Sequence, residues 1–203
     1  MTYQLYRGDL PEGLLLGDAV AIDTEAMGLN PHRDRLCLVQ LSRGNGDAYL
    51  VQFDAGCYDA PNLRRLLADP GILKLFHFAR FDIAMLYHYL GVMARPLYCT
   101  KVASRLVRTF TDRHGLRDLC KDLLGVDLKK EQQTSDWGAA SLSEEQLRYA
   151  ASDVRYLHAL RTRLDEMLAR EGRTELARSC FDFLPVRALL DLEGWPEQDI
   201  FAH

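Results

Sequence analysis

The chain has 203 residues, 48% hydrophobic and 27% charged, which suits one α/β domain with a well-buried core. Its net charge of −4 argues against strong sequence-independent binding to long nucleic acid, which needs many Lys and Arg residues on phosphates. No segment approaches the roughly 20 apolar residues that span a bilayer, and the N-terminus lacks a signal-peptide core. The five cysteines form no Cys-x-x-Cys pair, which favours reduced thiols and a cytoplasmic location.

The apolar pattern predicts a sheet built early in the chain and covered by helices. The predicted strands are residues 19–25, 36–42, 48–53, 72–76 and 98–99, with a turn at 44–47 that makes the start antiparallel. The predicted helices are residues 62–68, 80–90, 100–109, 115–124, 144–170 and 174–181. Residues 129–140 are predicted as a loop, and the tail with Pro185 and Pro196 as irregular. The fold class is α/β, a mixed sheet flanked by helices.

Two acidic residues, Asp23 and Glu25, end the apolar run of the first predicted strand. Side chains two apart on a strand point to the same face, so these carboxylates would repel each other unless a cation lies between them. Hard divalent cations take oxygen ligands of this kind. The alternative is a strand end that simply becomes polar as it reaches solvent.

Two later patches strengthen the metal hypothesis. Asp82 falls in the first turns of a predicted helix, after the segment that begins at His77. Tyr149 and Asp153 are four residues apart and therefore share a helix face. That helix begins at a capping box formed by Ser143 and Gln146. Each patch also has a bland reading, as helix-start chemistry or as a surface acid beside a half-buried tyrosine.

Taken in order, the three patches resemble the motifs of the DEDD superfamily of 3′–5′ exonucleases, in its tyrosine-containing branch. Further similarity to ribonuclease D lies in segments 36–42, 115–126 and 142–146, in Lys130 and in Ser135-Asp136-Trp137. The match covers about residues 15–170. One departure is Cys99-Thr100, where ribonuclease D relatives carry Asp-Thr; that position is not among the metal acids.

The resemblance implies one exonuclease domain over residues 1–203, with the ribonuclease H-like fold and a tail at 171–203. The short tail looks like that of the nano-RNase C type, which acts on dinucleotides and very short oligonucleotides. Met27-Gly28-Leu29 looks like the oligoribonuclease pattern, in which a Leu lies between the two bases of a dinucleotide. The expected partners are short RNA or DNA strands with a free 3′ end and further copies of the chain. Apolar residues of segment 181–203 favour a homo-oligomer, expected to be a ring such as an octamer. The alternative is that this tail folds back on its own domain.

The resemblance also implies a site with two Mg²⁺ or Mn²⁺ ions, held by four carboxylates. Asp23 would bridge the ions, Glu25 and Asp153 would complete the site of the ion holding the attacking water, and Asp82 would hold the second ion through water. Tyr149 would aim the water, because a phenol that titrates near pH 10 is not a free base at neutral pH.

The remaining site assignments keep an ordinary structural alternative. Leu29 is either a wedge between two bases or a packed leucine, and Trp137 either stacks on a base or is half-buried in a loop. Thr24 is expected to contact substrate; His77 either orients substrate or caps a strand end. Phe78 is expected in the core. Three other functions stay open: an exonuclease for longer strands, a polymerase-associated proofreading domain, and an inactive binding module.

Overall fold

The computed structural model describes residues 2–128 and 135–202, so Lys130 lies outside the described residues. A single mixed sheet forms the centre, with the strand order β1-β4-β3-β2-β5-β6. The strands are β1 (Thr2–Arg7), β2 (Ala19–Ala26), β3 (Leu36–Ser42), β4 (Asp47–Gln52), β5 (Leu73–Phe76) and β6 (Leu97–Cys99). β2, β3 and β4 are antiparallel neighbours, whereas β1 runs parallel to β4, and β5 runs parallel to both β2 and β6. The predicted mixed sheet is confirmed.

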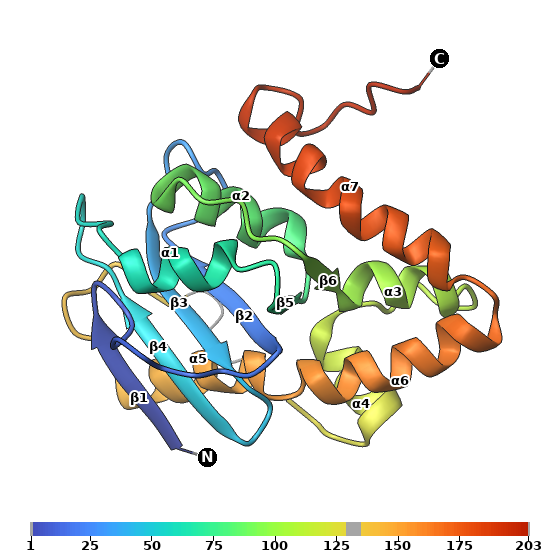
Figure 1. Ribbon diagram of the computed structural model, residues 1–203, viewed down its shortest axis with the longest axis horizontal. Helices are drawn as coiled ribbons and strands as arrows, with labels where there is room; N and C mark the ends of the chain where they lie inside the picture. The colour runs from blue at the N-terminus through green and yellow to red at the C-terminus, as the bar shows by residue number, and fades with distance from the viewer. Residues whose placement is uncertain (1, 129–134, 203) are drawn as a thin grey trace.

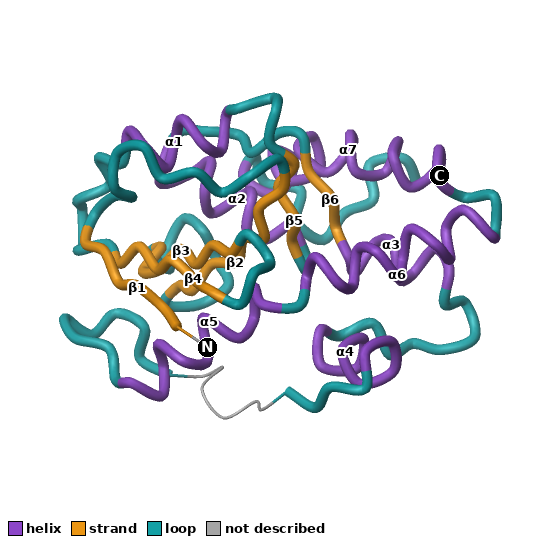
Figure 2. Tube along the Cα trace, turned by 60° about the horizontal axis from the view of Figure 1, so that its bottom comes forward, coloured by secondary structure: helices purple, strands orange, loops and turns teal. Residues whose placement is uncertain are grey.

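Helices cover both faces of this sheet, and further helices lie beyond its β6 edge (Figures 1 and 2). They are α1 (Pro61–Ala68), α2 (Ala79–Leu90), α3 (Thr100–Val107), α4 (Leu116–Leu124), α5 (Glu144–Arg155), α6 (Leu157–Arg170) and α7 (Thr174–Leu192). α5 packs against β1 to β4 on one face, and α2 packs against β2, β3 and β5 on the other. α3, α4, α6 and α7 contact one another and form a helical layer beside β5 and β6.

The central strand β3 is buried along its whole length, because helices cover it on both faces. A strand covered in this way is apolar at nearly every position rather than at alternate ones. The two polar exceptions on β3 are Gln40 and Ser42, which are 0% and 1% exposed. A polar group is costly to bury unless it is hydrogen-bonded, so the Gln40 side chain is expected to have a hydrogen-bond partner nearby.

The structure differs from the predicted elements in three places: a strand at the N-terminus, the helix predicted at residues 144–170, and the C-terminal segment. The first strand, β1, was missed because its burial does not alternate cleanly and most of its side chains are exposed. The predicted helix 144–170 is two helices, with Tyr156 between α5 and α6 at φ −104° and ψ −1°. The break allows α5 to lie on the sheet while α6 joins the helical layer.

The C-terminal segment is also more regular than predicted. α7 continues through Pro185 to Leu192, although proline removes one backbone hydrogen bond from a helix. Packing compensates, because Phe181, Leu184 and Ala188 are all buried on the same face. The Phe181 ring meets Tyr98 at 4.6 Å between centroids. The irregular tail is therefore confined to the residues after α7. No helix among the described residues is both long and apolar enough to cross a membrane.

Candidate active site

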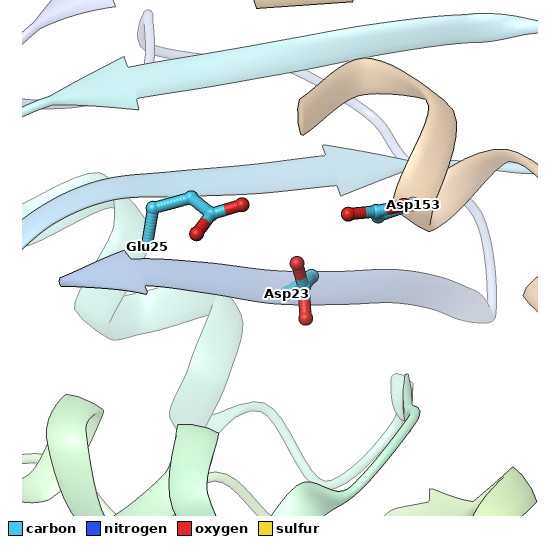
Figure 3. Close-up of side chains that lie close together, drawn as sticks. All are labelled: Asp23, Glu25 and Asp153. Atoms are coloured by element: carbon cyan, nitrogen blue, oxygen red, sulfur yellow. The ribbon is translucent and has the colours of Figure 1, made fainter. Parts of the chain in front are cut away.

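The site begins at the end of β2, where Asp23 and Glu25 point to the same face (Figure 3). The pairing of β2 with β3 changes register between Glu25 and Ala26, as in a β-bulge. Gln40 lies directly opposite Asp23 on β3, and its amide Nε2 donates a hydrogen bond of 2.7 Å to Asp23 Oδ2. An interaction with the same side chain lowers the pKa of Glu25, against the larger rise caused by burial.

Asp153 reaches this pair from α5, the helix that packs on this face of the sheet (Figure 3). Carboxylate oxygens of Asp23, Glu25 and Asp153 all lie within 4.8 Å of one another. The predicted capping box at the start of α5 is confirmed, since Ser143 accepts from the Gln146 backbone and the Gln146 side chain accepts from the Ser143 backbone. This cap fixes the start of the helix that carries Tyr149 and Asp153 one turn apart.

Asp82 lies close to this group but is held separately. It sits in the first turn of α2, as predicted, and is only 2% exposed. The Thr24 hydroxyl donates a hydrogen bond of 2.7 Å to Asp82 Oδ1. Thr24 itself is buried, so its hydroxyl serves Asp82, and the expected substrate contact of this side chain is not supported by the geometry.

Burial raises the pKa of all four carboxyl groups, and repulsion by a neighbouring carboxylate adds to the rise in three of them. Burial raises the pKa of Asp23 from 3.8 to about 7. Burial first, and then the negative charge of Asp23, raise the pKa of Glu25, Asp82 and Asp153 well above the ordinary range. Such clustering is unfavourable without a positive charge. The all-oxygen donor set fits Mg²⁺ or Mn²⁺, and a divalent cation there would relieve the repulsion.

Tyr149 lies beside the acids and stays protonated. Burial, followed by the charges of Asp153 and Glu25, raises the pKa of the Tyr149 phenol far above its usual value. Its hydroxyl is therefore a hydrogen-bond donor at neutral pH, and it favours the ionised form of the neighbouring Asp153. This agrees with the expectation that Tyr149 is not a general base.

Trp137 packs behind Tyr149, with 6.1 Å between the ring centroids. The indole is 2% exposed and has no open face for a base, which favours the packed alternative over stacking on substrate. The backbone after Trp137 is held by three side chains of the sheet region. Arg35 donates to the Gly138 carbonyl at 2.9 Å, Gln52 to Ala139 at 3.1 Å and Arg7 to Ala140 at 2.7 Å.

His77 follows β5, the strand that pairs with β2. The parallel pairing Ala19↔Leu73 and Ala21↔Leu75, continued by two residues, brings His77 level with Asp23. His77 Nδ1 lies 2.9 Å from Thr100 Oγ1, and this hydroxyl donates to the Phe76 carbonyl at 3.2 Å. Nδ1 must therefore carry the proton, which leaves Nε2 as an acceptor. Burial and the nearby Lys101 lower the pKa of His77 to about 3, so the ring is neutral.

Leu29 lies on the loop between β2 and β3 and is 82% exposed, so it is not a packed leucine. Asp34 braces this loop by accepting from the Asn30 backbone at 3.0 Å. Tyr89 of α2 adds a hydrogen bond of 3.0 Å to the Pro31 carbonyl. The loop thus presents two exposed apolar side chains, Met27 and the more exposed Leu29, and its hydrogen bonds hold it in place.

The structure shows two features near the site that the sequence pattern does not predict. Gln40 belongs to an expected strand, and only its polar character within a buried strand signals its contact with Asp23. Phe78 was expected in the core but is 45% exposed, and its φ of +69° is unusual for a residue with a bulky side chain. The Lys101 ammonium lies 4.1 Å from the centre of its ring. Nothing in the sequence pattern indicates this conformation.

Comparison with known proteins places the chain in a family. The model of the 3′–5′ exonuclease family matches residues 9–169. Ribonuclease D of Gluconacetobacter diazotrophicus is 38% identical over 160 residues, which are 79% of this chain and 40% of that protein. The chain thus spans less than half the length of this curated relative.

Solved structures extend the similarity to the whole chain. NrnC of Brucella melitensis with bound Mg²⁺ is 56% identical, covers 100% of both chains and has a TM-score of 0.96. NrnC bound to pGG is 57% identical, with a TM-score of 0.97 over 100% of this chain and 99% of the other. Ribonuclease D of Escherichia coli is 26% identical over 84% of this chain and 45% of its own, with a TM-score of 0.72. The chain therefore belongs to the 3′–5′ exonuclease family, in its ribonuclease D-like branch.

Proposed function

We propose that this protein removes nucleotides from the 3′ end of very short oligonucleotides and acts fastest on dinucleotides. The observation that carries the proposal is the group formed by Asp23, Glu25 and Asp153, whose oxygens lie within 4.8 Å of one another beside Tyr149. Full-length similarity to NrnC, which has been solved with pGG, supports the short substrate. The five cysteines of this chain are unpaired, which accords with the expected cytoplasmic location.

Hydrolysis of a phosphodiester needs an activated water and a stabilised leaving oxygen. Two bound divalent cations would lower the pKa of the water and neutralise the leaving 3′-oxygen. Asp23, Glu25 and Asp153 would hold these cations directly. Asp82 would contribute to the second cation through water, since the Thr24 hydroxyl occupies one of its oxygens at 2.7 Å.

Tyr149 would position the attacking water rather than take its proton. The raised pKa of this phenol keeps the hydroxyl proton in place, and Asp153 fixes the direction of the hydroxyl. The Trp137 ring behind it restricts the movement of the phenol. His77, neutral and with Nε2 as an acceptor, would accept a hydrogen bond from a sugar hydroxyl of the substrate.

Leu29 would separate the two bases of a dinucleotide. Its 82% exposure at the tip of a braced loop suits a side chain that inserts between bases, which favours the wedge alternative. The net charge of −4 also suits a short substrate held by cations better than a long strand held by many phosphate contacts.

We also propose that the protein is a homo-oligomer, expected to be a ring such as an octamer. The inner face of α7 packs on its own domain, so the revised candidate interface is the outer face of α7 with the segment after it. The large apolar side chains exposed there are Leu176, Phe183, Val186, Trp195, Ile200 and Phe201. Apolar side chains gathered in this way favour burial against another copy.

Turnover of 5′-phosphorylated RNA strands of two to seven nucleotides, with the matching DNA strands in parallel, tests the proposal. The expected result is fastest cleavage of the dinucleotide in Mg²⁺ or Mn²⁺ and none by Asp23→Ala. Equal rates on all lengths would replace the proposal with a general 3′–5′ exonuclease. Wild-type rates from folded Asp23→Ala would remove the metal mechanism.

A further inference from the structure

The inference concerns Gln40, which contacts the acidic cluster but is not an acid. It is 0% exposed at the centre of β3, and its position opposite Asp23 is fixed by the antiparallel register. Its amide nitrogen donates to Asp23 Oδ2 at 2.7 Å, and an interaction with the same side chain lowers the pKa of Glu25 against the larger rise caused by burial. One buried amide thus acts on both acids of β2 from the neighbouring strand.

The orientation of this amide follows from its neighbours. An amide oxygen turned toward Asp23 would face a carboxylate that can only accept when ionised, so the nitrogen must take that side. The amide oxygen, Oε1, accepts no hydrogen bond from any described residue, which is a cost that a packed core rarely bears. The hydrogen bond from Nε2 to Asp23 is therefore the contact that holds the Gln40 amide in place.

We propose that Gln40 is a positioning residue for the metal site, which fixes the carboxylates of Asp23 and Glu25 in the orientation that binds a divalent cation. This rests on the proposed function, because it assumes that the acids bind metal. A hydrogen bond to Asp23 Oδ2 limits rotation of that carboxylate and would leave Oδ1 available to bind a cation. Hydrogen-bond partners behind metal ligands typically contribute about 10- to 100-fold to metal affinity.

The chain contains a well-matched control in Gln52 on β4. It is also a buried glutamine, 2% exposed, with one hydrogen bond from its Nε2 and an Oε1 without a partner among the described residues. Its nitrogen donates to the Ala139 carbonyl at 3.1 Å rather than to an acid. Gln40→Met and Gln52→Met therefore remove equivalent buried amides, but only the first touches the carboxylates.

The measurement is Mn²⁺ affinity of the full-length protein, by titration calorimetry or electron paramagnetic resonance, together with thermal unfolding in EDTA. We expect Gln40→Met to bind Mn²⁺ about 10- to 100-fold more weakly than wild type, and Gln52→Met to match wild type. Gln40→Asn, which keeps a shorter amide donor, should fall between and provides the readout if Gln40→Met does not fold.

Two outcomes would overturn the inference. The first is wild-type Mn²⁺ affinity in folded Gln40→Met or, where that variant does not fold, in Gln40→Asn. The second is a loss of Mn²⁺ affinity in Gln52→Met that equals the loss in Gln40→Met. Failure of the proposed function is distinguishable from these, because wild-type protein itself would then bind no Mn²⁺. An altered unfolding temperature in EDTA with unaltered Mn²⁺ affinity would assign Gln40 a purely structural role.

Discussion

Replacing Asp23 by Asn should stabilise the metal-free protein while abolishing its hydrolysis. The folded state raises the pKa of Asp23 from 3.8 to about 7, because the carboxyl is buried. At about 1.36 kcal/mol for each pH unit, ionising this group in the folded protein costs about 4 kcal/mol. For a chain of this size that corresponds to an upper limit of about 8–16 °C in unfolding temperature.

The sign of the pH dependence follows from the direction of this shift. Below pH 3.8, Asp23 is protonated in both the folded and the unfolded state, so it adds no destabilisation. As pH rises from 3.8 to about 7, the unfolded state loses the proton first, and the folded state becomes progressively less stable. In EDTA, Asp23→Asn should therefore match wild type at the acidic end of this range and unfold at a higher temperature above pH 7.

The assay is thermal unfolding by circular dichroism in EDTA and in millimolar Mn²⁺, across this pH range. Mn²⁺ should raise the unfolding temperature of wild type at high pH and that of Asp23→Asn much less. Asp59→Asn is the matched control, since its carboxylate is 93% exposed and makes only a surface ion pair of 3.7 Å with Arg64. An Asp23→Asn protein that unfolds at or below the wild-type temperature above pH 7 would refute the reasoning.

The remaining predictions concern the water, the bases and the subunits. In steady-state kinetics, Tyr149→Phe should lower kcat by about 10²-fold with little change in KM, since it removes only the hydroxyl that aims the water. A change confined to KM would make Tyr149 a binding residue. Leu29→Ala should raise KM for a dinucleotide about 10-fold, and an unchanged KM would end its role as a wedge. Removing the residues after Glu193, with Trp195, Ile200 and Phe201, should lower the mass measured in solution by light scattering. A monomeric full-length protein at micromolar concentration would exclude the ring.

The sequence alone located the acids because their spacing matches the periods of the elements that carry them. Asp23 and Glu25 share a face of a strand, and Tyr149 and Asp153 share a face of a helix, so local geometry alone pairs them. The helix start at Ser143 was also readable, since a capping box is a local pattern. The buried strands β2 and β3 were visible for the same reason, as continuous apolar runs.

What the sequence did not predict depends on contacts between distant segments. Gln40 gains its role from strand register, and Trp137 gains its role from packing behind Tyr149. The separation of α5 from α6 at Tyr156 follows from the different layers on which the two helices lie. α7 passes through Pro185 because the packing of its inner face outweighs the lost hydrogen bond, and local propensity carries no sign of that packing.

The ion pair between Arg80 and Asp191 links the last helix to the helix of Asp82. Arg80 Nε lies 2.5 Å from Asp191 Oδ2, and Arg80 precedes Asp82 by two residues on α2. The family model ends at residue 169, before α7 begins. α7 therefore lies outside the segment that the family model matches, yet it is tied by this ion pair to the helix that carries Asp82. A substitution of Asp191 on α7 would therefore remove a contact of α2 without altering any of the four acids.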